Sequence, residues 1–246
     1  MPMSQKLTRR GFLAFVILIG LCAATATAQA AIPTEVQVLF IGNSLTYVND
    51  LPKMVLELAQ AGKQPPLRYQ QQTPGGCTLE KHWNDGKALA KIQSRKWDFV
   101  VLQDYSSAPL LNRDSMFDYG KKFDAEIKKQ GAKTLLYMTW ALQNKPGNQA
   151  AISKAYLDLS KDLKAEIAPV GKAWEAALLA DKKLVLHQGD KKHPTATGTY
   201  LAACVFYATI YGISPEGLPG SVAKLTDEEA RPLQVIAWKV VQETGK

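Results

Sequence analysis

Residues 38–46 read VLFIGNSLT, a short apolar run that ends at a glycine and is followed by a serine. This pattern is typical of a buried parallel strand that delivers a side chain to the carboxyl edge of its sheet. Ser44 is therefore a candidate nucleophile. The same Gly-Asn-Ser sequence is also ordinary turn chemistry, because Gly and Asn tolerate left-handed backbone and Ser bonds to nearby amides.

Strand-like and helix-like segments alternate along the chain on both sides of this stretch. Residues 97–103, WDFVVLQ, form the clearest central strand, because they are continuously apolar, as in a strand that is covered on both faces. Further strands are predicted at residues 35–41, 67–73, 134–139 and 167–170, and helices at 50–61, 79–92, 115–130, 150–166, 172–180, 197–211 and from 226 onward. The alternation predicts an α/β fold, a three-layer α/β/α sandwich around a parallel five-stranded sheet.

The first 30 residues have the three parts of a secretory signal peptide: a basic start, an apolar run and a small-residue region that ends at Ala30. The apolar run is short for a membrane span, although an uncleaved anchor is the alternative. Residues 8–13, TRRGFL, also resemble the twin-arginine export motif, and the Sec route stays open. We therefore predict a signal peptide at 1–30 and a single domain at 31–246. The mature protein is expected to be exported from a bacterial cell, periplasmic or secreted, without stable membrane insertion.

The net charge indicates which classes of partner to expect. The net charge of +8 comes from scattered lysines, and no basic stripe interleaved with aromatic residues indicates nucleic-acid binding. An anionic surface or polymer remains an alternative partner.

Beyond residue 30, the cysteines are Cys77 and Cys204. A disulfide is permitted in an exported protein, but Cys204 lies in an apolar helical run that favours a free buried thiol. Nothing in the sequence indicates the oligomeric state.

A serine needs an adjacent base, usually a histidine that is itself oriented by a carboxylate. Residues 190–194, DKKHP, place Asp190 three residues before His193, so one tight loop can bring the carboxylate to the imidazole. The alternative for this short pattern is a loop at a helix entry. His82 and His187 lie in segments where a surface or packing role is expected. Because the three histidines lack close spacing, the sequence predicts no metal site.

Acyl transfer also needs donors that face the developing oxyanion. The backbone amides of Ser44 and Gly76 and the side-chain amide of Gln103 are the candidates, because each follows a predicted strand and would share one edge of the sheet. The alternatives are a plain turn at residues 75–76 and a polar strand end at Gln103.

The chain contains four short sequence blocks in this order: GNSL at 42–45, Gly76 with Thr78, VLQD at 101–104 and DKKHP at 190–194. They resemble the blocks of the SGNH/GDSL hydrolase superfamily over nearly the whole chain after residue 30. The resemblance implies a serine esterase or lipase with a flavodoxin-like fold and no metal or organic cofactor. It also implies that Ser44 is the nucleophile, His193 the base and Asp190 its partner, with Ser44, Gly76 and Gln103 in the oxyanion hole.

The chain departs from the family pattern at two positions. Asn43 replaces the Asp of Gly-Asp-Ser-Leu, a position that transfers no proton. In the third block, where the family has Gly-x-Asn-Asp, Gln103 is one methylene longer than the usual Asn. A Leu-Gln-Asp third block is similar to that of an uncharacterised bacterial branch of SGNH-like proteins.

These residues predict hydrolysis of carboxylic esters through an acyl-enzyme. The expected substrate is a small-molecule or carbohydrate ester with a short acyl group, such as acetyl. One alternative is a non-catalytic exported carbohydrate-binding or assembly protein on the same fold. The other is an O-acyltransferase, because the same three side chains can pass an acyl group to a sugar hydroxyl instead of water.

Overall fold

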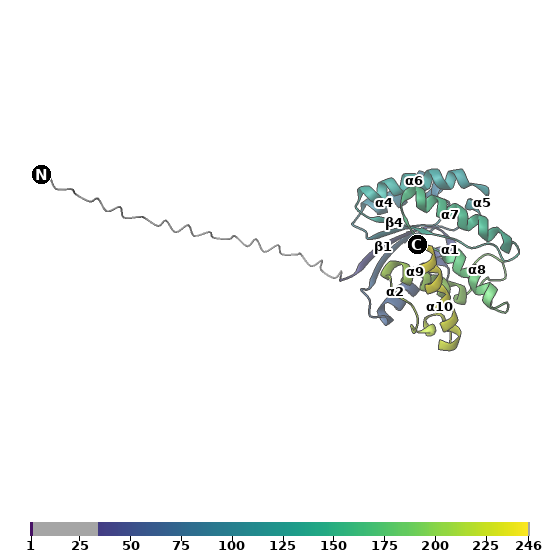
Figure 1. The fold of residues 1–246 in the computed structure, drawn as a ribbon. Helices are drawn as coiled ribbons and strands as arrows, with labels where there is room; N and C mark the ends of the chain where they lie inside the picture. Colours follow the sequence, from purple (N-terminus) through teal and green to yellow (C-terminus); the bar gives the residue numbers. More distant parts are fainter. Residues whose placement is uncertain (2–33, 246) are drawn as a thin grey trace. The chain divides into compact units, whose positions relative to one another are not determined.

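A computed structural model describes Met1 and residues 34–245. The predicted signal peptide at 1–30 lies, apart from Met1, outside the described residues. Residues 34–245 form a layered α/β unit in which helices cover the sheet on two sides (Figure 1).

The sheet of residues 34–245 has five parallel strands in the order β2-β1-β3-β4-β5. The strands are β1 (Val36–Ile41), β2 (Leu67–Gln72), β3 (Phe99–Leu102), β4 (Lys133–Tyr137) and β5 (Glu166–Ala168). This is the flavodoxin-like order, so the predicted three-layer α/β/α fold with a parallel five-stranded sheet is confirmed. The glutamine-rich β2 lies at one edge of the sheet, where polar side chains can reach solvent.

Alternate residues of the central strands point into two separate cores. Val38 and Phe40 of β1 belong to one core, and Leu39 and Ile41 belong to the other. Helices α2 (Leu51–Ala61), α8 (Val170–Ala180), α9 (Ala196–Tyr211) and α10 (Asp227–Thr244) pack on the first face. Helices α3 (Leu79–Asp85), α4 (Lys87–Gln93), α5 (Ala108–Leu111), α6 (Arg113–Lys129) and α7 (Gln149–Leu163) pack on the second face. The period of two residues in the strands thus produces the three layers.

Helix α9 is apolar on all sides because it is buried along most of its length. All eleven residues from Gly198 to Ala208 are buried, between the sheet and helices α2, α8 and α10.

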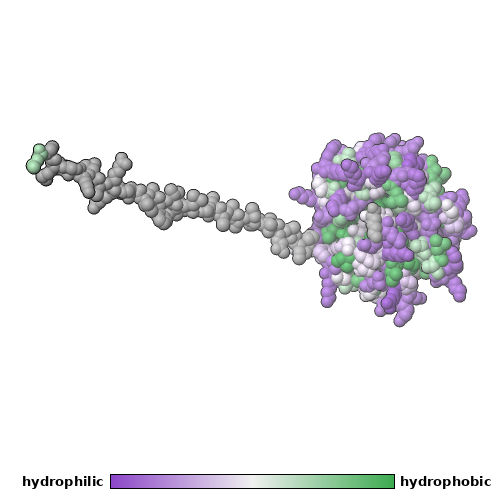
Figure 2. All heavy atoms as spheres, in the orientation of Figure 1, coloured by the Kyte–Doolittle hydropathy of each residue, from purple (hydrophilic) through white to green (hydrophobic). Residues whose placement is uncertain are grey.

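The visible face of residues 34–245 is largely hydrophilic, with small apolar areas between the charged side chains (Figure 2). None of the described helices is long and apolar enough to cross a membrane.

Two details of the predicted elements need correction. The fifth strand was expected at 167–170, but it ends at Ala168 because Pro169 has no N–H to donate and precedes the first residue of α8. The short helix α5, between β3 and α6, was not predicted. The helix predicted at 79–92 is divided into α3 and α4, because Gly86 takes a φ of 74° between them.

Candidate active site

Ser44 is the first residue of the short helix α1 (Ser44–Tyr47), which follows β1 directly. Asn43 has extended backbone and caps this helix, because its Oδ1 accepts the N–H of Leu45 at 3.1 Å. Gly42 provides the space for this tight exit from the strand: a Cβ at this position would lie 2.5 Å from Oε1 of Gln103. The strand therefore delivers Ser44 to the carboxyl edge of the sheet, with 7% of its surface exposed.

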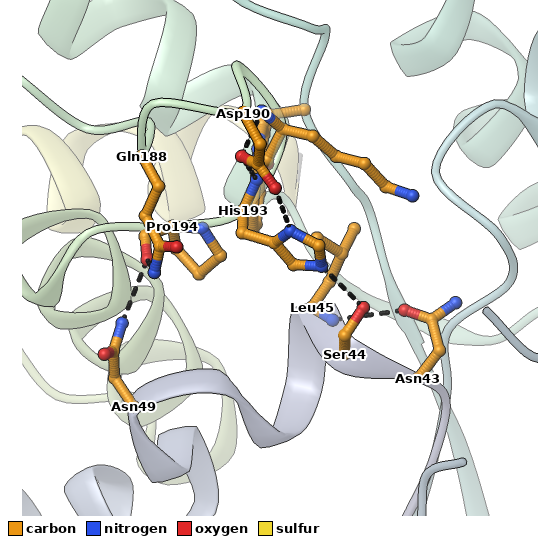
Figure 3. Close-up of polar contacts among 10 residues, drawn as sticks. Asn43, Ser44, Leu45, Asn49, Gln188, Asp190, His193 and Pro194 are labelled. Atoms are coloured by element: carbon orange, nitrogen blue, oxygen red, sulfur yellow. Dashed lines mark hydrogen bonds and ion pairs between the residues drawn. The ribbon is translucent and has the colours of Figure 1, made fainter. Parts of the chain in front are cut away.

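The loop before α9 brings His193 to Ser44. The imidazole Nε2 lies 2.8 Å from the Ser44 Oγ, and Nδ1 bonds to the carboxylate of Asp190 (Figure 3). Since the carboxylate can only accept, Nδ1 carries the proton and Nε2 is free to accept the serine hydroxyl proton. The structure thus brings together Ser44, His193 and Asp190, the three side chains that the sequence predicts to act together.

Asp190 is well suited to hold an imidazole while remaining charged. Its side chain is 46% exposed, and its Oδ1 accepts the backbone N–H groups of Lys192 at 3.0 Å and His193 at 2.9 Å. The hydrogen bond from the His193 side chain and the backbone N–H groups lower the pKa of Asp190 to about 2. The carboxylate is therefore ionised throughout the neutral range. Lys191, with a φ of 64°, makes the tight bend of this loop.

The loop of His193 is anchored by contacts from distant parts of the chain. The Nδ2 of Asn49 donates to the carbonyl of Pro194 at 3.0 Å (Figure 3). The same Nδ2 lies 2.9 Å from Oγ1 of Thr199, to which it also donates. Gln188 donates to the same Pro194 carbonyl at 2.9 Å. Trp140, which follows β4, donates its indole N–H to the carbonyl of Lys192 at 3.0 Å. Asn49 could not be identified from the sequence, because its partners lie about 150 residues away in the chain.

Two backbone N–H groups remain free to bind an oxyanion. In the part of the chain that the structure describes, the amides of Ser44 and Gly76 have no hydrogen-bond acceptor. Gly76 has a φ of 64°, the left-handed conformation that favours glycine. The Nδ2 of Asn43 donates to the carbonyl of Cys77 at 3.0 Å and so ties this turn to the residue before Ser44. Both amides are therefore placed at the same edge as Ser44 Oγ.

Gln103 does not join this group. Its side chain has no exposed surface: Oε1 accepts the backbone N–H of Asn43 at 3.0 Å and the Thr46 hydroxyl at 2.8 Å, and Nε2 donates to the carbonyl of Asp104. A backbone N–H is only a donor, so these partners fix the orientation of the amide. The expectation that Gln103 faces the oxyanion is corrected. Its longer side chain reaches Asn43, Thr46 and Asp104, and its amide thereby holds the turn between β1 and α1.

The other histidines and cysteines have structural contacts. His82 is buried and its Nε2 lies 2.7 Å from the carbonyl of Gly42, while burial lowers its pKa. His187 is buried and bonds to the carbonyl of Ala141. Cys77 and Cys204 are both free and buried, so no disulfide joins them. Of the surface and packing roles expected for the histidines, these contacts support packing, and Cys204 has the free buried thiol that was expected.

Comparison with known proteins shows which class of proteins shares this fold. The sequence matches no model of a protein family, and no functionally curated protein matches it. Solved structures do match, and they show that the chain has the fold of SGNH/GDSL hydrolases, which confirms the resemblance of the four blocks at the level of the fold.

Three solved structures illustrate the match. A candidate SGNH hydrolase from Slackia heliotrinireducens is 25% identical, with 72% of this chain and 99% of that chain covered and a TM-score of 0.61. A DUF4886 family protein from Bacteroides uniformis is 18% identical, covers 86% of this chain and 96% of its own, and has a TM-score of 0.71. Axe2, an acetylxylan esterase from Geobacillus stearothermophilus, is 16% identical over 73% of this chain and 95% of its own, with a TM-score of 0.59.

Proposed function

We propose that this protein is a serine hydrolase that cleaves carboxylic esters through an acyl-enzyme on Ser44. The observation that carries the proposal is the 2.8 Å contact between Ser44 Oγ and His193 Nε2, with Asp190 bonded to the opposite nitrogen of the same ring. A weak hydroxyl nucleophile, a base in contact with it and a group that orients the base are the requirements for nucleophilic catalysis by serine.

In the proposed reaction, Ser44 Oγ attacks the ester carbonyl carbon while its proton passes to Nε2 of His193. Asp190 stabilises the imidazolium, and the N–H groups of Ser44 and Gly76 bind the oxyanion. When the intermediate collapses, the C–O bond to the alcohol breaks and His193 gives the alcohol its proton. Water then attacks the acyl-enzyme with the same base. The net reaction converts one ester and one water into one carboxylic acid and one alcohol.

The substrate class proposed is a short acyl ester, such as an acetyl group on a carbohydrate. Structures named as acetylxylan esterases share this fold, at 16% identity. The signal-like sequence at residues 1–30 supports export, which would give the protein access to polysaccharide outside the cytoplasm. N-terminal sequencing of the exported protein tests this, and an intact N-terminus would contradict cleavage after Ala30.

The decisive experiment compares the mature chain with Ser44→Ala on 4-nitrophenyl acetate and 4-nitrophenyl butyrate. We expect the wild type to hydrolyse acetate faster than butyrate, and Ser44→Ala to lose at least about 10³-fold in kcat with an unchanged thermal unfolding midpoint. Labelling with a serine-directed fluorophosphonate is the second measurement, and the label should map to Ser44. A wild type that neither turns over an ester nor accepts the label would contradict the proposal and favour the binding-protein alternative.

A further inference from the structure

Lys192 joins three segments at the carboxyl edge of the sheet. It lies between Asp190 and His193 in the sequence, and its carbonyl accepts the indole N–H of Trp140 at 3.0 Å. Its ammonium lies over the ring of Tyr105, with Nζ 4.7 Å from the ring centroid. Tyr105 follows β3 and Trp140 follows β4, so the lysine side chain crosses from the His193 loop to the neighbouring loop. A cation is thereby held over the loop that follows β3, at the same carboxyl edge of the sheet as Ser44.

The nearby charges leave this region positive. Among the described residues, Lys145, Lys191 and Lys192 form no ion pair. Lys145 lines a small hollow together with Trp140. The carboxylates that face the same loops are already engaged, since Asp190 binds His193 and the buried Asp104 accepts the N–H groups of Leu79 and Tyr105. Hydrogen bonds do not cancel the charges of Asp190 and Asp104, so the three lysines exceed these two carboxylates by one positive charge.

The chemistry of the proposed reaction decides which part of the ester meets Lys192. The carbonyl oxygen must point to the N–H groups of Ser44 and Gly76, which bind the oxyanion. The alcohol oxygen must lie within reach of His193 Nε2, which protonates it as it leaves. Because Lys192 directly precedes His193 in the chain, the alcohol part of the ester, which must lie at His193, is the part nearest to the lysine.

We propose that the preferred substrates carry a negative charge, such as a carboxylate, on the alcohol part of the ester, and that Lys192 is the residue that selects them. An acidic sugar bearing an acetyl group has this chemistry. The inference rests on the proposed function, because it needs an ester seated between the oxyanion donors and His193. It adds to that function a substrate class and a specificity residue that neither the fold nor the triad implies.

The test compares two acetyl esters that differ only in charge, 3-acetoxybenzoate and 3-acetoxybenzamide. We expect the wild type to prefer the carboxylate, by about tenfold in kcat/KM at low ionic strength, and the preference should shrink as salt is added. Lys192→Gln should remove most of this preference, and Lys192→Glu should reverse it. The matched control is Lys161→Gln, an exposed lysine at the end of α7 near the opposite edge of the sheet, which should leave the ratio unchanged.

Two results would overturn the inference: equal kcat/KM values for the two esters in the wild type, or a preference that survives in Lys192→Glu. Binding of both esters to Ser44→Ala, followed by NMR titration, separates this inference from the proposed function. Tighter binding of the carboxylate that depends on Lys192 would support the charged substrate class even if the wild type fails to turn over either ester. Equal binding of both esters would reject that class even in an active esterase.

Discussion

Asp104 is a buried carboxylate next to the candidate site that the proposed reaction does not use. Its Oδ1 accepts the N–H of Leu79 at 3.1 Å and the N–H of Tyr105 at 2.6 Å, so it joins the start of α3 to the loop after β3. Burial raises its pKa from 3.8 to about 6, although these hydrogen bonds act in the opposite direction. Near neutral pH, the folded protein therefore contains a largely ionised carboxylate at a site where burial penalises its charge.

This environment predicts how stability depends on pH. Because the folded-state pKa is raised, the favourable contribution of protonated Asp104 is complete below pH 3.8 and is lost as the pH rises through about 6. Asp104→Asn keeps an acceptor oxygen without the charge. We expect this variant to be more stable than the wild type at pH 8, by up to about 3 kcal/mol, and to approach the wild type near pH 4.

Urea unfolding of both proteins at several pH values measures this difference. Asp118→Asn, which removes an exposed carboxylate on α6, is the control and should give no comparable pH dependence. A difference between Asp104→Asn and the wild type that stays constant from pH 4 to pH 8 would show that ionisation of Asp104 is not the cause.

Contacts between close neighbours in the sequence could be predicted, whereas contacts between distant residues could not. The contact between Asp190 and His193 could be predicted, because both lie in one tight loop at a fixed spacing. The partners of Gln103 could not be predicted, because they depend on side-chain reach across the edge of the sheet. The amide chemistry, the position after a strand and the family pattern all suggested an oxyanion donor there, whereas the extra methylene takes the amide to Asn43 and Thr46. The catalytic roles of Ser44, His193 and Asp190 stay predictions until activity is measured.

At the scale of elements, the segment between α1 and α2 links the two halves of the candidate site. Asn49 and Asp50 both have positive φ, 57° and 51°, and they turn the chain from the helix of Ser44 into α2. Asparagine tolerates this conformation better than most residues. The turn aims the amide of Asn49 at Pro194, the residue after His193. Asn49 is therefore a positioning residue that couples the serine helix to the histidine loop.

We predict that Asn49→Gly lowers kcat for 4-nitrophenyl acetate by about tenfold and changes KM much less. Glycine retains the left-handed backbone, so the loss reports the missing amide contacts to Pro194 and Thr199. The remaining bond from Gln188 to Pro194 limits the effect. Asn49→Ala should add a loss of stability of about 1 kcal/mol, because alanine disfavours positive φ.

Steady-state kinetics and thermal unfolding of the two variants separate these effects. If Asn49→Gly keeps full kcat while Asn49→Ala loses it, backbone conformation would be the cause and the amide contacts would not position His193. The rate of fluorophosphonate labelling gives an independent measure of Ser44 reactivity in each variant.

Most elements were predictable because their hydrophobic period and their end signals agree. The helix predicted from residue 226 onward begins as expected, because Thr226 and Glu229 form a capping box whose two hydrogen bonds are both present. Helix α5 could not be predicted, since four residues carry too little periodicity and its tertiary contacts with α6 and α7 stabilise it. The end of β5 was misplaced by the apolar Val170, which begins α8 and does not extend the strand.

At the scale of residues 34–245, both apolar cores depend on the same sheet. Strand β1 contributes Phe40 to one core and Ile41 to the other, and Ser44 follows within three residues. The shared strand means that loosening one core also removes support from the other. The candidate site lies at the end of this strand, so its geometry depends on both layers of helices.

Phe206 tests this dependence, because it is buried in α9 on one side of the sheet only. Its ring lies 4.9 Å from the ring of Tyr137 and 5.7 Å from that of Phe40, between centroids. We expect Phe206→Ala to lower the free energy of unfolding by about 3–5 kcal/mol. Because the sheet couples the two cores, fluorescence of Trp97 in the opposite core, isolated in a variant that retains only this tryptophan, should change at the same urea concentration as far-UV circular dichroism. A separate, later transition of Trp97 in Phe206→Ala would show instead that the two layers unfold independently, and that the site could be lost while one core remains folded.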